Sequence, residues 1–220
     1  MHASLTTVRG AGPDVSATAR MAAESMLAWL REFDGYRGLV VLADPETGDA
    51  RFMTFWDSVD ALERSERGRR EVRESMIAAA GAELESVDRY ELFFGEELPA
   101  VSIESSNQDM PAFARFTSFE GPSASIEEGY RTFKNDLVEW FRDATGFRGW
   151  IALLDVPGGR SIGITLWATP EALADEAASG AGLRDEVAAG LQTKVTSVER
   201  YEVVTAEALA LDETTQRRDA

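Results

Sequence analysis

The sequence predicts an α+β protein in which two copies of one strand–helix–strand–strand–helix–strand unit pack their antiparallel sheets face to face. The first observation is an ungapped internal repeat at an offset of 111 residues, which maps Trp56 onto Trp167. The second is a pair of strands, 39–43 and 150–154, whose consecutive apolar residues indicate cover on both faces. Helices cover one face of each sheet, so the second unit is expected to cover the other.

Each of these strands is entered through a glycine that ends the preceding helix. Gly35 and Gly146 stand at this corner, where a left-handed backbone costs glycine little. The first strands are expected at 4–8 and 113–119, and the first helix shows apolar residues at steps of three and four. These apolar positions are Val15, Ala19, Ala22, Met26, Leu30 and Phe33 in the first copy, and Ile126, Tyr130, Phe133, Leu137 and Phe141 in the second.

The second half of each unit is predicted as a turn, a third strand, a second helix and a fourth strand. Glycines within the second helix are expected to break it. The third strands, the helix breaks and the ends of the fourth strands are placed at 52–56 and 162–167, at Gly68 and Gly180, and at Tyr90 and Tyr201.

The chain divides into four predicted segments. These are a first unit at 1–95, an acidic linker at 96–111, a second unit at 112–205 and a polar tail at 206–220. The linker has room for a short additional strand at 100–103.

Composition excludes several classes of function. The absence of cysteine excludes disulfides and thiolate chemistry, and a net charge of −17 repels a phosphate backbone, so no nucleic-acid partner is expected. No stretch of sequence is apolar for long enough to span a membrane, and a cytoplasmic location is expected.

Two motifs, each present in both units, resemble a known family. One is Gly-aromatic-Arg-Gly before a strand, at 35–38 and 146–149, and the other is Trp-x-[Ser/Thr]-x-[Asp/Glu]-Ala-Leu, at 56–62 and 167–173. Together they resemble the antibiotic-biosynthesis monooxygenase-like dimeric α+β barrels. The resemblance implies two ferredoxin-like units joined as an internal pseudo-dimeric barrel, with further homo-dimerisation open. Relatives include cofactor-free oxygenases, haem degraders, cyclases and proteins of no known activity.

The sequence departs from this family at positions that carry chemistry. Oxygenases of the family place a histidine nine or ten residues after the tryptophan, where this chain has Ser65 and Glu66, or Glu176 and Ala177. The one histidine, His2, is expected at a mobile chain end. No histidine-ligated haem, flavin or transition metal is therefore expected, and the predicted cofactor set is empty.

Two functions remain open from the sequence. The chain is either a small-molecule enzyme, acting as a cofactor-independent oxygenase or cyclase on an aromatic or polyketide-like substrate, or a non-catalytic ligand-binding or structural module of the same fold. In both cases the expected partner is a small hydrophobic or aromatic molecule. Its predicted pocket residues are Trp56, Tyr130, Arg131, Phe133, Gly163, Thr165 and Trp167.

The more open pocket is expected in the second unit. Gly163 there replaces Phe52, whereas on the first helix Tyr130 and Phe133 replace two alanines. The alternative interpretation is volume compensation, in which a large strand residue faces small helix residues and the reverse holds in the other unit.

Charged residues identical in both units most simply serve the fold that the units share. We therefore predict structural ion pairs for these residues, and we interpret the carboxylates and arginines along 63–74 as a solvated helix face. The duplicated charged residues are Arg37 and Arg148, Arg89 and Arg200, and Glu91 and Glu202.

Overall fold

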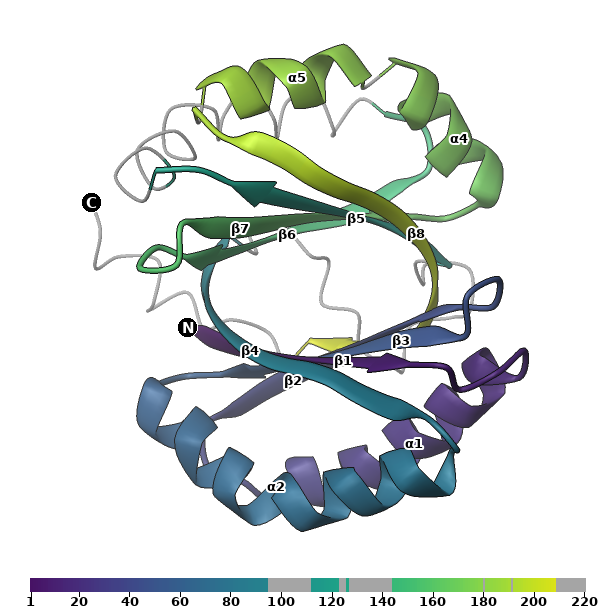
Figure 1. Cartoon of the computed structure of the whole chain (residues 1–220), viewed down its shortest axis with the longest axis vertical. Coiled ribbons are helices and arrows are strands. Elements are labelled where there is room, and N and C mark those ends of the chain that lie inside the picture. The colour runs from purple at the N-terminus through teal and green to yellow at the C-terminus, as the bar shows by residue number, and fades with distance from the viewer. Residues whose placement is uncertain (95–111, 123–125, 127–143, 180, 191, 209–220) are drawn as a thin grey trace.

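Two units of similar topology make up the protein (Figure 1). The computed structural model describes residues 1–94, 112–122, 126, 144–179, 181–190 and 192–208. The first unit contains β1 (His2–Arg9), α1 (Val15–Leu30), β2 (Tyr36–Asp44), β3 (Asp49–Trp56), α2 (Val59–Ala79) and β4 (Glu83–Phe94). The second contains β5 (Phe113–Glu120), β6 (Phe147–Asp155), β7 (Arg160–Trp167), α4 (Pro170–Ser179), α5 (Ala181–Gly190) and β8 (Lys194–Ala208).

The strands form one closed antiparallel barrel in the order β1-β3-β2-β8-β5-β7-β6-β4. Each unit contributes a run of neighbouring strands, and the units are joined by β2 pairing with β8 and by β4 pairing with β6. Figure 1 shows the helices outside the barrel, over the two opposed sheets. The predicted α+β fold with two sheets face to face is therefore confirmed.

Side chains at alternate positions along a strand face either the inside of the barrel or the helices, so the protein has two kinds of core. In β2, Val40 and Leu42 belong to the cluster inside the barrel, whereas Leu39 and Val41 belong to the cluster under α1. All four side chains are fully or almost fully buried, so the consecutive apolar residues reflect cover on both faces, as expected.

The second helix differs from its prediction in the first unit. Ser58 caps α2 by accepting a hydrogen bond from the Ala61 backbone N–H, and the helix then runs through Gly68 without a break. The expected break at Gly68 is wrong, because glycine in a helix interior costs only about 1 kcal/mol and neighbouring residues can offset it. In the second unit, α4 and α5 flank residue 180, which lies outside the described residues.

Two further expectations have different outcomes. His2 is not at a mobile end, because it lies in β1 opposite Trp56 of β3 and Glu91 of β4, half-buried, and burial lowers the pKa of its imidazole.

The possible strand at 100–103 and most of the second unit's first helix fall outside the described residues. In the described part of the chain, no helix combines the length and apolar character needed to cross a bilayer.

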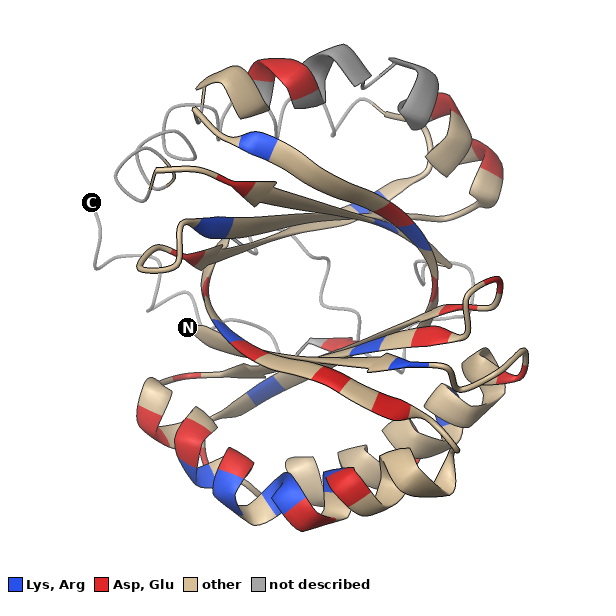
Figure 2. Ribbon diagram, in the orientation of Figure 1, with Lys and Arg blue, Asp and Glu red and all other residues tan. Residues whose placement is uncertain are grey.

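Ion pairs join the two units and tie α2 to the sheet. Figure 2 shows where the charged residues lie along the ribbon. Arg51 of the first unit binds Glu199 and Tyr201 of the second, and Arg160 of the second binds Asp88 of the first at 3.2 Å. The pairs predicted for Arg37 and Arg89 also form within the first unit. Their partners are Asp57 at 2.5 Å for Arg37, and Glu63 at 3.0 Å and Glu66 at 2.6 Å for Arg89.

Candidate functional site

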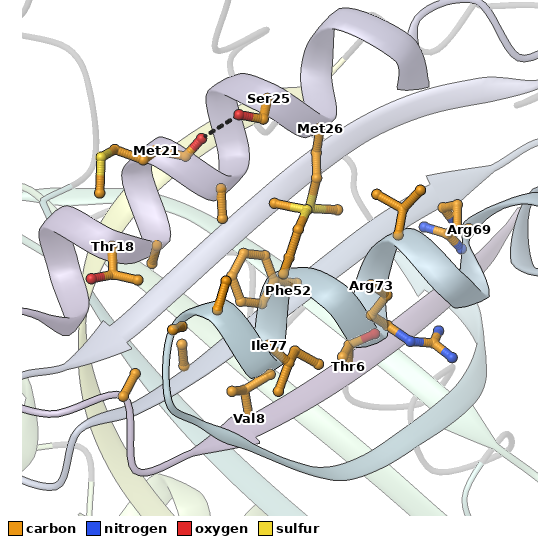
Figure 3. A pocket seen from close by; sticks show the side chains of 18 of the residues that line it. Thr6, Val8, Thr18, Met21, Ser25, Met26, Phe52, Arg69, Arg73 and Ile77 are labelled. Carbon is orange, nitrogen blue, oxygen red and sulfur yellow. Dashed lines mark hydrogen bonds between the residues drawn. The ribbon is translucent and has the colours of Figure 1, made fainter.

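A cavity of about 320 Å³ lies between α1 and α2, over the outer face of β1 and β3 (Figure 3). Helix α1 packs chiefly on β2, whereas α2 packs over β1, β3 and β4, so the strip of sheet between the helices is left partly uncovered. The volume is at the lower end of the range of small-molecule sites. Met21 and Val72 line its rim and are 63% and 45% exposed, which leaves it open to solvent.

The floor of the cavity is formed by outward-facing residues of two neighbouring strands. Thr6 and Val8 come from β1, and Ala50, Phe52 and Thr54 come from β3. Strand residues at alternate positions point to the same face, which places each set on the helix side of the sheet. Thr6 and Phe52 keep part of their surface accessible although helices flank them on both sides.

Small side chains on α1 create much of the space. Ala19 and Ala22 face the cavity two turns and one turn before Met26, and they contribute only methyl groups to its wall. The repeat places Tyr130 and Phe133 at the corresponding positions of the second unit, so the sequence puts the small residues on this helix in the first unit only.

The opposite wall comes from α2 and carries charge. Arg69, Val72, Arg73, Met76 and Ile77 line the cavity, at spacings of three and four that place them on one helical face. Figure 3 shows both arginines toward one end of the cavity, with Val8 and Ile77 toward the other.

Arg69 is held by neutral acceptors. It is 6% exposed, and its Nε donates to the Ser65 carbonyl oxygen and its Nη1 to Thr54 Oγ1, both at 3.2 Å. Its guanidinium carbon also lies 5.3 Å from the centre of the Trp56 ring. Burial lowers the Arg69 pKa to about 10, with Glu66 opposing this shift and Arg73 adding to it. The side chain therefore remains a cation at neutral pH.

Arg73 stands one turn further along α2. Its Nε is buried and has no hydrogen-bond partner. Within the described residues, no carboxylate lies within 4.0 Å of the guanidinium of Arg69 or Arg73. One end of a mainly apolar cavity thus carries two cations that have no direct counter-ion among the described residues.

The residues predicted from the sequence lie around the site or away from it. Trp56 is fully buried on the same helix-facing side of β3 as Thr54 but does not line the cavity, and its Nε1 donates to Thr54 Oγ1 at 3.0 Å. Trp167 and Thr165 make the same contact at 2.9 Å in the second unit. Gly163 lies near Phe119 and Trp150, with ordinary contact distances for an added Cβ. Tyr130, Arg131 and Phe133 lie outside the described residues, so the expected second-unit pocket stays a prediction.

The sequence analysis missed Arg69 and Arg73 because it assigned their helix to solvent. A signal was present: Leu62, Ser65 and Arg69 follow one another at three- and four-residue steps on the face that leads to Val72. The repeat gave a second signal, since the counterpart of Arg69 is Gly180. A residue present in one copy only is not required by the fold that both copies share.

Comparison with solved structures identifies the fold. An anthrone oxidase-like protein matches with a TM-score of 0.64 and 14% identity, over 96% of this chain and 94% of its own. A haem-degrading enzyme from Listeria monocytogenes matches with a TM-score of 0.53 and 10% identity, over 92% of this chain and 99% of its own. A ferredoxin-fold protein from Listeria monocytogenes, related to antibiotic biosynthesis monooxygenases, matches with a TM-score of 0.51 and 8% identity, over 91% of this chain and 94% of its own.

These likenesses confirm the predicted barrel of two ferredoxin-like units and extend over nearly the whole chain. At such identities they establish the fold alone. No protein-family model and no curated protein matches the sequence.

One of the similar structures is a haem-degrading enzyme, but the lining of this cavity does not fit haem. Haem iron is held in proteins by histidine, cysteine or tyrosine, or by methionine together with histidine. Among the described residues that line the cavity there is no histidine, cysteine or tyrosine. We therefore derive no step through haem.

Proposed function

We propose that this protein binds a small, largely apolar molecule in the cavity between α1 and α2 of its first unit. The observation that carries the proposal is the cavity itself, about 320 Å³ in volume and bounded mainly by aliphatic and aromatic side chains. Ligand sites are typically apolar hollows of this kind with a few polar groups that fix orientation. Here those groups are Thr54, Arg69 and Arg73.

The sequence supports a cavity that is retained rather than incidental. The repeat has aromatic residues, Tyr130 and Phe133, at the sequence positions where the first unit has Ala19 and Ala22. Apolar lining that faces solvent lacks the contact energy of a packed core, roughly 25 cal/mol per Å² of apolar surface. A bound molecule would recover part of that contact energy.

A neutral fluorescent probe tests binding at this place. We expect N-phenyl-1-naphthylamine to bind the wild-type protein with increased fluorescence. Ala22→Phe, which installs the second unit's residue, should weaken binding at least about tenfold because the ring occupies the space of the probe. Ala28→Phe adds the same ring at an exposed α1 position and serves as the control. Equal binding by all three proteins would place the probe elsewhere and contradict the proposal.

Cofactor-independent oxygenation is a second candidate function. Whole-chain likeness to an anthrone oxidase-like protein favours it, as does a cationic end that would stabilise a phenolate or enolate. In the oxidation of anthrone, the ring CH₂ becomes a ketone, one atom of O₂ enters the product, and the other leaves as water with the two hydrogens. The described lining has no carboxylate, histidine or tyrosine to act as a base, so the substrate would have to ionise by itself.

Oxygen uptake with anthrone separates this reaction from binding alone. An oxygenase should form anthraquinone faster than buffer or heat-denatured protein does, and Arg69→Met should slow it whereas the exposed Arg70→Met should not. Formation at the buffer rate, together with probe binding, would leave the non-catalytic ligand-binding module as the function.

The proposal also covers the location of the protein and its partners. The proposed location is the cytoplasm, and the proposed absence of a nucleic-acid partner agrees with a net charge of −17. The internal pairing of the two units supplies the barrel within one chain, so a second chain would not be needed to complete the site.

A further inference from the structure

We propose that the cavity selects apolar carboxylic acids and binds them as anions, with Arg69 and Arg73 forming the carboxylate-binding end. This inference rests on the proposed binding function and adds the chemical class of the ligand.

Arg69 is buried with no carboxylate at ion-pair distance among the described residues, and Glu66, which pairs with Arg89, acts on its charge only at longer range. Burying a cation costs free energy unless it is paired, and the neutral oxygens of Ser65 and Thr54 position the group without cancelling its charge. Two other partly buried arginines of the described chain do meet carboxylates: Arg51 meets Glu199, and Arg160 meets Asp155. The sequence has 39 acidic residues, so carboxylates are abundant, yet none of the described ones pairs directly with Arg69.

The two units show that Arg69 is an addition to a shared framework. Thr54 and Trp56 have identical counterparts in Thr165 and Trp167, and the tryptophan–threonine hydrogen bond occurs in both. The counterpart of Arg69 is Gly180, so the framework folds without this arginine in the second unit. The arginine is therefore better explained by a ligand than by folding.

The arrangement of the two guanidinium groups fits a carboxylate. The Nε and Nη1 of Arg69 donate hydrogen bonds to protein oxygens, whereas no hydrogen bond within the described chain involves its Nη2. Arg73 has an unpartnered Nε, and residues four apart on a helix place their Cβ atoms about 5–6 Å from each other. Guanidinium N–H groups and carboxylate oxygens form short, charge-assisted hydrogen bonds, which favours an anion between these two side chains.

The rest of the cavity defines the body of the ligand. Met26, Phe52 and Ile77 surround the space beyond the arginines (Figure 3). Methionine adapts to irregular apolar shapes, and the half-buried Phe52 ring offers a face for stacking. A ligand with an aromatic or branched aliphatic body and one terminal carboxylate would fit both the apolar part of the cavity and its cationic end.

A matched pair of ligands tests the inference. Calorimetric titration would compare 2-naphthoate with methyl 2-naphthoate, which has the same ring system without the charge. The wild-type protein should bind the acid at least about tenfold more tightly than the ester, because only the acid can form charge-assisted hydrogen bonds with the guanidinium groups. Arg69→Met keeps the apolar stem and removes the charge, so it should abolish this preference while ester binding stays within about twofold.

Controls separate a local effect from a change in net charge or fold. Arg70→Met changes the net charge equally at a side chain that is 75% exposed and paired with Glu74, and it should leave both affinities unchanged. If Arg69→Met melts at a much lower temperature, Arg73→Met provides the second variant, with the exposed Arg67→Met as its control. Tight ester binding without preference for the acid would overturn the carboxylate end alone. Binding of neither ligand would overturn this inference, while the neutral-probe experiment above decides the cavity itself.

Discussion

Thr54 accepts hydrogen bonds from both Trp56 and Arg69, whereas Thr165 accepts the corresponding bond from Trp167. One hydroxyl thus connects a core tryptophan, which the repeat places in both units, with an arginine that only the first unit has. The candidate site is assembled on a contact that serves the fold.

Replacing that hydroxyl should affect stability and binding together. Thr54→Val removes the acceptor of two buried donors, and we expect the free energy of unfolding to fall by about 2–3 kcal/mol, with weaker 2-naphthoate binding. Thr165→Val removes one such bond and should cost less, with binding unchanged. Urea denaturation and calorimetric titration measure the two effects. Equal stability losses and unchanged binding in both variants would contradict this role of Thr54.

At the scale of elements, the sequence predicted the strands better than the second helix. The glycine before β2 or β6 and the run of consecutive apolar residues that follows it together indicate where each strand lies. Few other structures satisfy both signals. Gly68 was misinterpreted as a break, because glycine weakens a helix without having to end it. The cavity could not be predicted, because it depends on the distance between α1 and α2, and no local pattern encodes that distance.

A continuous α2 makes a clear prediction for its glycine. Gly68→Ala should raise the free energy of unfolding by about 1 kcal/mol, because alanine is the better helix former and its Cβ would contact Phe33 at 3.5 Å without a clash. Gly81→Ala is the matched comparison, since Gly81 follows the helix with a φ of 65° and has open space around it. Strain there should lower stability by about 1–2 kcal/mol. Thermal unfolding that shows no gain for Gly68→Ala would indicate an interrupted helix.

At the scale of the whole molecule, the two units depend on one another. The barrel closes only through β2–β8 and β4–β6, and its interior is a single apolar cluster drawn from both sheets. The repeat and the double-sided strands predicted this arrangement. The cross-unit ion pairs were not predictable from the repeat, because Arg51 and Arg160 do not occupy equivalent positions.

The first unit alone should not persist as a monomer. A fragment of residues 1–95 would expose the inner faces of β1, β2 and β3, including Leu5, Val40 and Phe55, so it should dimerise or aggregate. Size-exclusion chromatography with light scattering measures the outcome. A well-dispersed, folded monomer would contradict the dependence of one unit on the other.

The junction at Glu199 should make stability sensitive to acid. Burial raises the pKa of Glu199, but hydrogen bonds and charge from Tyr201 and Arg51 outweigh it, and the net pKa lies below the ordinary value of 4.5. A carboxylate with a depressed folded-state pKa stabilises the fold above its unfolded pKa and loses that contribution as pH falls. Glu199→Gln should therefore lose less stability than wild type between pH 5 and pH 3, measured by denaturant unfolding. An equal or larger loss would contradict the pairing.

Hydrogen exchange measured with and without saturating 2-naphthoate tests most directly the claim that ligand binds between α1 and α2. The account predicts slower amide exchange in peptides covering 15–30 and 69–79, since a bound molecule would fill the space between these helices and suppress their local opening. Peptides covering 181–190 should be unaffected. Slowing confined to the second unit, or no slowing at a concentration that calorimetry shows to be saturating, would contradict the account.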